Sequence, residues 1–316
     1  MSRIVRALLR RLMGMIVVLA IVATVVFIIV RVTPGDPAAV MLGSEATPED
    51  VAQLRRQLGL DAPLIVQYGQ FMLGLLKGDL GQSIFLGQSV GEALLARAEP
   101  TFFLTLFSIL IASVIALPVG ILSAVKRGTL FDQAVVTATM IAASIPSFWL
   151  GLILIQVFAV GTGWFPASGY GGPDSPFLVR LQHLVLPAVA LGVVNSALIT
   201  RFTRAAMLDV LGDDYVRTAR AKGASERRVV LKHALKNALV PIITVIGLSV
   251  AMLVAGAVVT ETVFGLPGVG NLVVSAVLRR DYPVIQGTLL VVAAIYVLIN
   301  FVVDMLYIAV DPRVRL

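Results

Sequence analysis

The stretch 101-TFFLTLFSILIASVIALPVGILSAV-125 runs for 25 residues without a charged side chain. About 20 consecutive apolar residues are enough for a helix to cross the hydrocarbon core of a bilayer, so this stretch predicts a membrane-spanning helix. Similar apolar blocks recur along the chain, at Leu8–Val30, Phe131–Val160, Leu184–Thr200, Pro241–Val263 and Val284–Val310. The sequence therefore predicts an all-α integral membrane protein with about six transmembrane helices.

The composition supports this assignment. Hydrophobic residues make up 58% of the 316, charged residues 14%, and the mean hydropathy is +0.96. A water-soluble fold could not cover so much apolar surface. The net charge of +7 does not indicate nucleic-acid binding, because Lys and Arg gather at the ends of the apolar blocks, as topology determinants do. The chain has no cysteine, which excludes disulfides, thiolate metal sites and a cysteine nucleophile.

The distribution of basic residues predicts the orientation of the helices. Arg3, Arg6, Arg10 and Arg11 precede the apolar run at residues 12–30. This run is longer than the core of a cleaved signal peptide, so we expect a retained helix. Seventeen Lys and Arg lie in segments on the same side as the N-terminus, and only three lie in the two short loops opposite. By the positive-inside rule, both termini of this multi-pass protein are predicted to be cytoplasmic.

The long segment at about 31–100 carries helix signals and is predicted to be a helical extracytoplasmic structure. Thr47 and Asp50 form a capping box with Pro48 at the first helical position. The helix that starts there has an apolar stripe at Val51, Leu54 and Leu58. A second helix is predicted over Pro63–Leu76. A third is predicted from Ser89, where Glu92 closes another capping box.

A loop of this length is expected to have a role of its own. Two interpretations are open: a lid that only packs on the bundle, or a structure that contacts a partner or substrate outside.

Small residues recur at every fourth position in four of the blocks, which lets helix backbones approach closely. These residues are Ser108, Ala112, Ala116 and Gly120; Ala134, Ala138 and Ala142; Ala188, Gly192, Ser196 and Thr200; and Gly247, Ala251 and Ala255. Pro118, Pro146 and Pro187 are predicted to bend three helices.

No catalytic chemistry is apparent. The chain contains no phosphate-binding loop, no zinc-protease motif and no nucleophile elbow, and no metal site is expected. His183 and His233 are isolated near predicted membrane boundaries. Of the ionisable residues in the spans, Asp304 lies farthest inside, whereas Glu261 and Asp132 lie nearer the ends.

The inner loop between the fourth and fifth spans, at about 201–240, is predicted to form two short helices. Asp213 and Asp214 would cap the first, Tyr215–Lys222 would form it, and Gly223 would end it in the left-handed conformation. The second begins at the cap Ser225 with Glu226 and runs through Lys232 and Lys236 until Pro241 begins the next span.

This loop could lie on anionic lipid or dock to a protein. The first helix favours docking to a protein, because Tyr215, Arg217, Thr218 and Arg220 leave it little apolar face.

The stretch 214-DYVRTARAKG-223 resembles the cytoplasmic signature loop of ABC importer permeases, whose short helix seats in a groove of the ATPase subunit. Ala219 and Gly223 match the general E-A-A-x-x-x-G pattern, whereas Arg217 and Thr218 replace its glutamate and first alanine, as in the dipeptide and oligopeptide branch. The residues that the resemblance assigns to ATPase coupling are Asp214, Tyr215, Arg217, Thr218, Ala219, Arg220, Lys222 and Gly223.

Other stretches resemble the same branch, and a first helix followed by a long outer segment is similar to its B-type subunit. These stretches are 31-RVTPGDP-37, 58-LGLDAP-63, 78-GDLGQS-83, 261-ETVFGLPGVG-270 and 280-RDYP-283. The resemblance implies a type I importer permease fold, with residues 1–96 as first helix plus outer segment and 97–310 as permease core.

The resemblance also implies a function: alternating access in the bacterial inner membrane, with this chain forming half of a path for dipeptides or oligopeptides. The implied partners are a second, C-type permease subunit, two cytoplasmic ATPases that bind the ATP and Mg²⁺, and an outer solute-binding protein. This chain itself would bind no cofactor and catalyse no reaction.

The substrate is less defined, because relatives in the branch carry nickel chelates, glutathione, opines or sugars. Candidate path residues are Ser144, Ser147, Gln156 and Asn195, although such side chains also form helix-to-helix hydrogen bonds.

An ion-coupled secondary transporter is the alternative from another class. It requires midplane ionisable residues and an internal repeat, neither of which is found, and it has no need of a docking loop.

Overall fold

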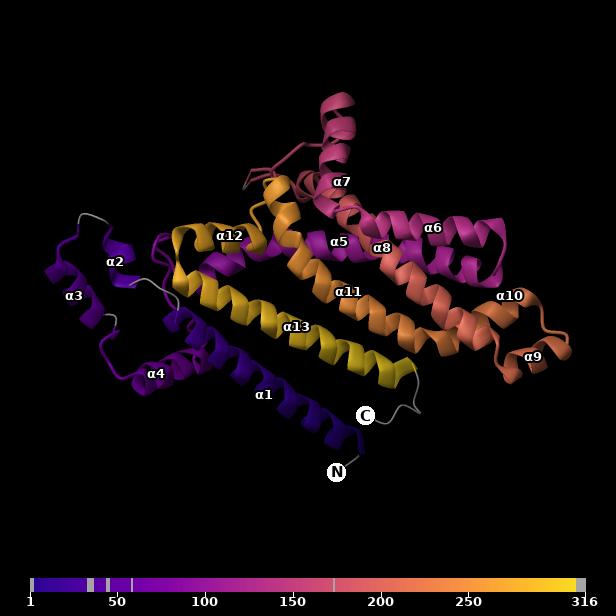
Figure 1. The fold of residues 1–316 in the computed structure, drawn as a ribbon, viewed down its shortest axis with the longest axis horizontal. Coiled ribbons are helices and arrows are strands. Elements are labelled where there is room, and N and C mark those ends of the chain that lie inside the picture. The colour runs from indigo at the N-terminus through magenta and orange to yellow at the C-terminus, as the bar shows by residue number, and fades with distance from the viewer. Residues whose placement is uncertain (1–2, 33–36, 44–45, 58, 173, 311–316) are drawn as a thin grey trace. The chain divides into compact units, whose positions relative to one another are not determined.

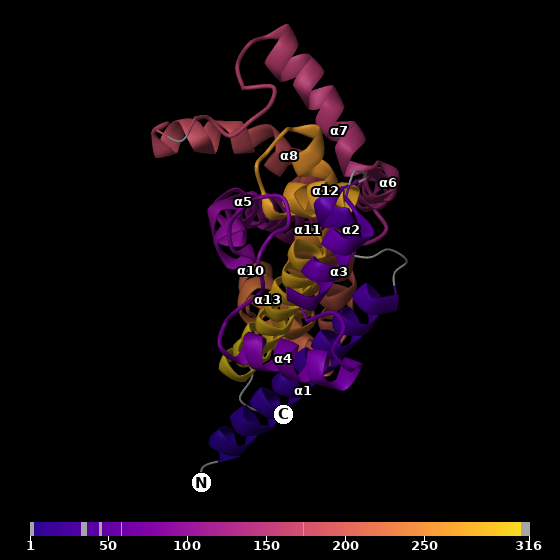
Figure 2. The same ribbon diagram turned by 90° about the vertical axis from the view of Figure 1, so that its left-hand side faces the viewer.

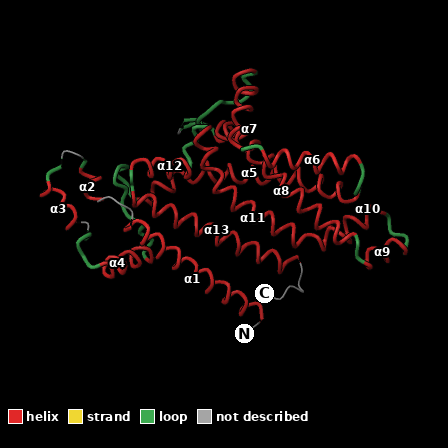
Figure 3. Tube along the Cα trace, viewed as in Figure 1, coloured by secondary structure: helices red, strands yellow, loops and turns green. Residues whose placement is uncertain are grey.

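The computed structural model describes residues 3–32, 37–43, 46–57, 59–172 and 174–310. Leu58 of the predicted stripe, residues 33–36 of the first motif, and Arg313 and Arg315 lie outside the described residues. The described part of the chain is helical and contains no strand (Figure 3); only one isolated bridge joins Gln82 to Ser89.

The helices are long, with short pieces between them (Figure 1). In chain order they are α1 (Arg3–Val32), α2 (Pro37–Leu42), α3 (Pro48–Gln57), α4 (Leu64–Leu76), α5 (Val90–Val125), α6 (Leu130–Ser144), α7 (Ser147–Leu154) with the π-helical turn η1 (Ile155–Gly161), α8 (Phe177–Leu211), α9 (Asp214–Ala221), α10 (Glu226–Arg228), η2 (Val229–Ala234), α11 (Leu235–Val263), α12 (Val269–Arg279) and α13 (Tyr282–Val310).

Five described helices are long and apolar enough to cross a membrane: Arg10–Val32, Val90–Val125, Phe177–Leu211, Glu226–Val263 and Tyr282–Tyr307. The predicted block at 131–160 forms a broken pair instead, in which Leu130–Ser144 and Ser147–Gly161 meet at 93°. Pro146 disfavours a helical conformation at Ile145, which is extended (φ −86°, ψ 122°). About six spans are thereby confirmed, as five helices plus the bent pair, whereas Pro118 and Pro187 lie inside continuous helices.

The chain divides into two compact units, residues 1–99 with 271–297, and residues 100–270 with 298–316. In the second unit, the predicted small-residue stripes of α5 and α8 face each other. A Cβ on Gly192 would lie 2.8 Å from Ile111 and 2.9 Å from the carbonyl oxygen of Ser108. A Cβ on Gly120 would lie 2.8 Å from the carbonyl oxygen of Thr200. The backbones of α5 and α8 therefore approach as closely as the pattern predicts.

The stripe on α6 does not pack inside the chain. Ala134 and Ala138 are exposed, because α6 turns its opposite side, with the buried Asp132 and Thr139, toward the rest of the unit. Ala134 and Ala138 therefore do not make the predicted close approach within the described part of this chain. Gly247 of α11, by contrast, packs directly on Val303 of α13.

One predicted helix boundary is wrong, because the second inner-loop helix continues through Pro241 into the fifth span. The helix predicted from Ser89 continues through Pro100 as α5. Buried residues on both sides, such as Ala238 and Ile242 around Pro241, stabilise the continuous helix against the loss of one backbone donor. The short helices α2 and α12 were not predicted.

In the first unit, the predicted outer helices form with their predicted caps. The amide of Asp50 donates to Thr47 Oγ1 and the amide of Thr47 donates to the Asp50 carboxylate, each at 3.2 Å. Hydrogen bonds from Thr47 lower the pKa of Asp50 below its usual value. The reciprocal pair between Ser89 and Glu92 forms as well.

We predict that Gly192→Ala destabilises the protein by about 1–3 kcal/mol, because its Cβ would force the α5 and α8 backbones apart. Gly256→Ala in α11 is the matched control, since a Cβ added there would meet no atom within 4 Å, and it should be neutral or slightly stabilising. Thermal unfolding in detergent micelles measures both, and equal midpoints for the two variants would contradict the close approach.

Candidate functional site

The predicted docking helix exists as α9, and Gly223 ends it as expected. Gly223 has φ +81°, its amide donates to the carbonyl oxygen of Arg220 at 2.9 Å, and the amide of Ala224 donates to that of Ala219 at 3.2 Å. These two bonds define a Schellman motif, which a left-handed glycine permits. The chain therefore reverses sharply after α9 and enters the helix that begins at Glu226.

Tyr215 fastens α9 to that following helix. Its hydroxyl accepts a hydrogen bond from Nδ2 of Asn237 at 2.7 Å and donates to the carbonyl oxygen of His233 at 3.4 Å. No sequence motif singles out Asn237 for this contact. His233 takes part through its backbone carbonyl and is half-buried.

A bidentate ion pair and a buried valine complete the attachment of α9 to the following helix. Arg220 donates from Nε and Nη2 to the two carboxylate oxygens of Glu226, at 3.1 and 2.7 Å. Val216 is fully buried, as is Val229 at the start of η2. Three different contacts therefore hold one face of α9 against the helix that leads into α11.

The opposite face of α9 is exposed in this chain. The side chains of Asp214 and Arg217 are 96% and 72% exposed, and Thr218 and Lys222 are also exposed. Asp213 and Ser225 occupy the predicted N-cap positions, although neither side chain makes a capping hydrogen bond. In Figure 1, α9 and α10 lie together at one end of α8 and α11.

An ion pair between the half-buried Arg204 and the buried Asp132 holds the neighbouring turn between α5 and α6. Arg204 of α8 donates to both carboxylate oxygens of Asp132, at 2.6 and 2.8 Å. Asp132 also accepts from Ser123 Oγ at 2.5 Å and from the amide of Gly128 at 2.9 Å. Arg204 sits in the stretch predicted to be loop, so its partner could not be recognised from sequence spacing.

Glu261, at the other end of α11, is fully buried. Thr101 donates to its Oε1 at 2.6 Å, and the same hydroxyl accepts from the amide of Val269 at 2.9 Å. A side chain at Gly268 or Gly270 would collide with the Glu261 carboxylate. The glycines of the 261–270 motif therefore leave room for this carboxylate.

The four candidate path residues lie on different elements: Ser144 ends α6, Ser147 begins α7, Gln156 lies in η1 and Asn195 in α8. The Ser144 hydroxyl and the Asn195 amide each bond the carbonyl oxygen four residues earlier in their own helix, at 3.0 and 2.8 Å. Ser144 and Gln156 are exposed within this chain, and Ser147 is half-buried. Ser144 and Asn195 thus do not make the helix-to-helix bonds considered from sequence.

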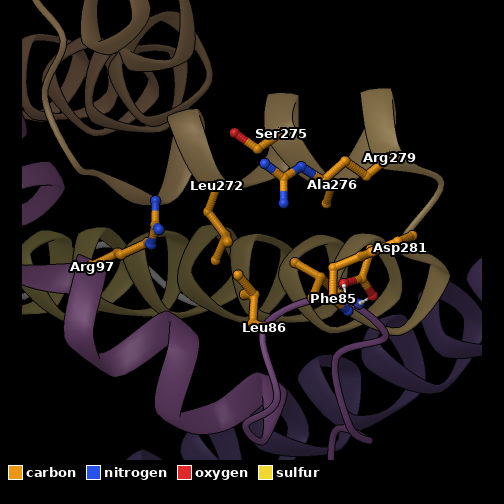
Figure 4. Close-up of a pocket in the computed structure, with 9 residues that line it drawn as sticks. Phe85, Leu86, Arg97, Leu272, Ser275, Ala276, Arg279 and Asp281 are labelled. Atoms are coloured by element: carbon orange, nitrogen blue, oxygen red, sulfur yellow. Dashed lines mark hydrogen bonds between the residues drawn. The ribbon is translucent and has the colours of Figure 1, made fainter.

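A small cavity lies within the first unit, between the start of α5, the loop after Gly81 and α12 (Figure 4). Its volume is about 110 Å³, and Arg97 and Arg279 line it. Asp281 also lines it, but its carboxylate is taken up by Ser83 Oγ at 2.5 Å and by nearby amides. Among the described residues, no ion pair joins Arg97 or Arg279 to a carboxylate.

These features define a class: a helical membrane protein with a short helix, α9, that exposes a polar face between two of its spans, and with no cluster of metal-ligating side chains among the described residues. Residues 116–316 match the family "Binding-protein-dependent transport system inner membrane component", and residues 4–89 match the N-terminal family of the same membrane components. The chain belongs to this family of ABC importer permeases.

Similar proteins agree along nearly the whole length. The di/tripeptide transport system permease DppB of Pseudomonas aeruginosa is 44% identical, covering 93% of this chain and 94% of its own. The glutathione transport system permease GsiC of Salmonella choleraesuis is also 44% identical, at 97% and 98% coverage. The inward-facing MetNI methionine ABC transporter, at 23% identity, shares the fold with a TM-score of 0.58 over 69% of this chain and 96% of its own.

We predict that Arg204→Ala destabilises the protein by about 1–3 kcal/mol, because the buried Asp132 carboxylate loses its cation and two charge-assisted hydrogen bonds. The double variant D132A/R204A should be less destabilised, since no unpaired charge remains. The fraction of each variant that remains folded in detergent after heating measures both effects. A double variant as unstable as R204A would show that the ion pair is not the cause.

Proposed function

We propose that this chain is one of two permease subunits of a bacterial importer for di- or oligopeptides. It forms half of the translocation path and transmits ATP-driven movement from cytoplasmic ATPase subunits. The substrate class is supported by relatives whose names specify peptides. Glutathione, itself a small peptide, is the second candidate, because a relative named for it is equally similar.

The main support for the proposal is the way in which α9 is attached to the following helix. An exposed polar face suits a groove on another protein, and the opposite face is fastened through Tyr215, Val216 and Arg220 to a helix that runs on to Val263. A push on α9 is therefore passed directly to a membrane-spanning helix. Such a rigid connection is what alternating access requires of a coupling element.

The proposed assembly has four kinds of partner. Two ATPase subunits contact α9 and hold the ATP and Mg²⁺, and a C-type permease subunit completes the path. A solute-binding protein delivers substrate from outside, and the lipid bilayer surrounds the spans, with both termini of this chain facing the cytoplasm. Within the chain, residues 1–96 form the first helix and outer segment, and residues 97–310 form the permease core with its coupling loop.

The experiment that tests the substrate is uptake by proteoliposomes containing the complete transporter and its binding protein. Labelled dipeptides and tripeptides should accumulate with ATP, whereas nickel chelates, opines and sugars should not. Uptake of only a non-peptide ligand would overturn the peptide assignment and leave the permease assignment standing.

We predict that Gly223→Val uncouples ATP hydrolysis from transport. A side chain at φ +81° costs about 1–2 kcal/mol, and β-branched residues fit this conformation worst. That cost corresponds to roughly a tenfold loss in the share of correctly turned loop. Gly223→Asn is the control, because asparagine tolerates the left-handed conformation. Normal transport per ATP hydrolysed by the valine variant would contradict the coupling role.

We also predict that reversing charge at the cavity weakens docking of the binding protein. In R97E/R279E, stimulation of ATPase activity by the binding protein should fall severalfold, because the two native cations there would attract acidic side chains. The double variant R56E/K77E, whose two positions are exposed and lie outside the cavity lining, makes the same change in net charge and is the control. Equal stimulation in all three proteins would exclude the cavity as a contact.

A further inference from the structure

The outer helix α4 presents an apolar face that nothing in the described part of the first unit covers. Ile65, Leu73 and Leu76 lie on this face and are 76%, 59% and 83% exposed. The neighbouring helix α3 is instead polar, with both acidic residues in its first turn and both arginines in its last. The apolar face of α4 is therefore not a general property of the outer segment.

The position of the bilayer along α1 follows from its charges. Arg11 and Arg31 are separated by 20 residues, and no charged residue lies between them. At 1.5 Å per residue this is about 30 Å, the thickness of the hydrocarbon core. The two arginines therefore mark the two boundaries of the bilayer on α1.

The packing of α4 against α1 reaches below the boundary at Arg31. The hydroxyls of Tyr68 and Thr24 lie 2.8 Å apart, and the Phe27 ring contacts the rings of Tyr68 and Phe71 at centroid distances of 5.3 and 5.5 Å. Thr24 precedes Arg31 by seven residues, which is about 10 Å along the helix axis. Figures 1 and 2 both show α4 beside α1.

A polar side chain of α4, Gln67, contacts Arg31 at this boundary. Gln67 accepts from Arg31 Nε at 2.9 Å and donates to the carbonyl oxygens of Leu60 and Ala62. The Arg31 guanidinium also lies 4.8 Å from the centroid of the Phe27 ring. A cation held so close to the hydrocarbon needs such partners, and α4 supplies one of them.

We propose that α4 is an interfacial helix that lies in the outer leaflet, with Ile65, Leu73 and Leu76 against lipid acyl chains. A depth of about 5–10 Å is typical of such helices, and it matches the level of the contacts with α1. The occupant of the exposed face is lipid, because α1 also exposes apolar side chains at the same level, such as Val25 and Ile28. The proposal depends on membrane insertion and not on the proposed substrate.

The test measures the depth of a nitroxide spin label in the bilayer. The label is attached to a single introduced cysteine, because the chain has none of its own. Leu73→Cys and, as the matched control, Gln53→Cys on the exposed surface of α3 are labelled in the complete transporter, whose other subunits carry no cysteine. The complex is reconstituted in phosphatidylglycerol–phosphatidylethanolamine vesicles. Collisions of the label with oxygen and with a water-soluble nickel chelate are then compared by electron paramagnetic resonance.

The ratio of oxygen to nickel accessibility should be severalfold higher at position 73 than at position 53. A label at 73 that the nickel chelate reaches as readily as at 53 would place α4 in water and overturn the proposal. A label shielded from both reagents would place α4 against another protein subunit and overturn it equally. A second label at Ile65→Cys, on the same face, should repeat the result at 73.

Discussion

The close approach of α5 and α8 is the constraint on which the second unit depends. Helices in a bilayer gain little from burying apolar surface against each other, so they associate where small residues let backbones touch. Gly120 and Gly192 provide this on the two helices, and neither has room for a side chain. Because α8 also packs against α6, α7 and α11, its position fixes the end from which the loop to α9 departs.

The buried carboxylates lie at helix ends, where each one ties a turn. Asp132 holds the turn between α5 and α6, and Glu261 holds the segment between α11 and α12 through Thr101. Asp281 fixes the loop near Ser83 and receives the amide of Val284 in the first turn of α13. A carboxylate in an apolar setting is tolerated only when it is hydrogen-bonded. These three ionisable groups, of the kind that a secondary transporter would use to bind ions, therefore have structural partners in this chain.

Local signals and the bend at Pro146 could be predicted from the sequence, whereas which prolines interrupt a helix and which lie inside a continuous one could not. The capping box at Thr47 and the left-handed turn at Gly223 depend on neighbouring residues alone, so their letters suffice to predict them. Pro146 breaks a helix whereas Pro241 does not, because Ala238 and Ile242 are buried while most residues just after Pro146 are exposed or half-buried. That difference is tertiary, as is the pairing of Arg204 with Asp132, and no single-sequence pattern contains it.

The attachment of α9 derives its stiffness from burial and geometry more than from charge. Arg220 and Glu226 are each about half exposed, and ion pairs so exposed to solvent contribute little to stability. Val216 and the Schellman turn at Gly223 hold the helix in place, and the polar contacts orient it. The helix that receives this attachment carries Glu261, bonded to Thr101, at its far end. One continuous helix, Glu226–Val263, therefore connects the attachment of α9 to the carboxylate that Thr101 binds at the start of the apolar run of α5.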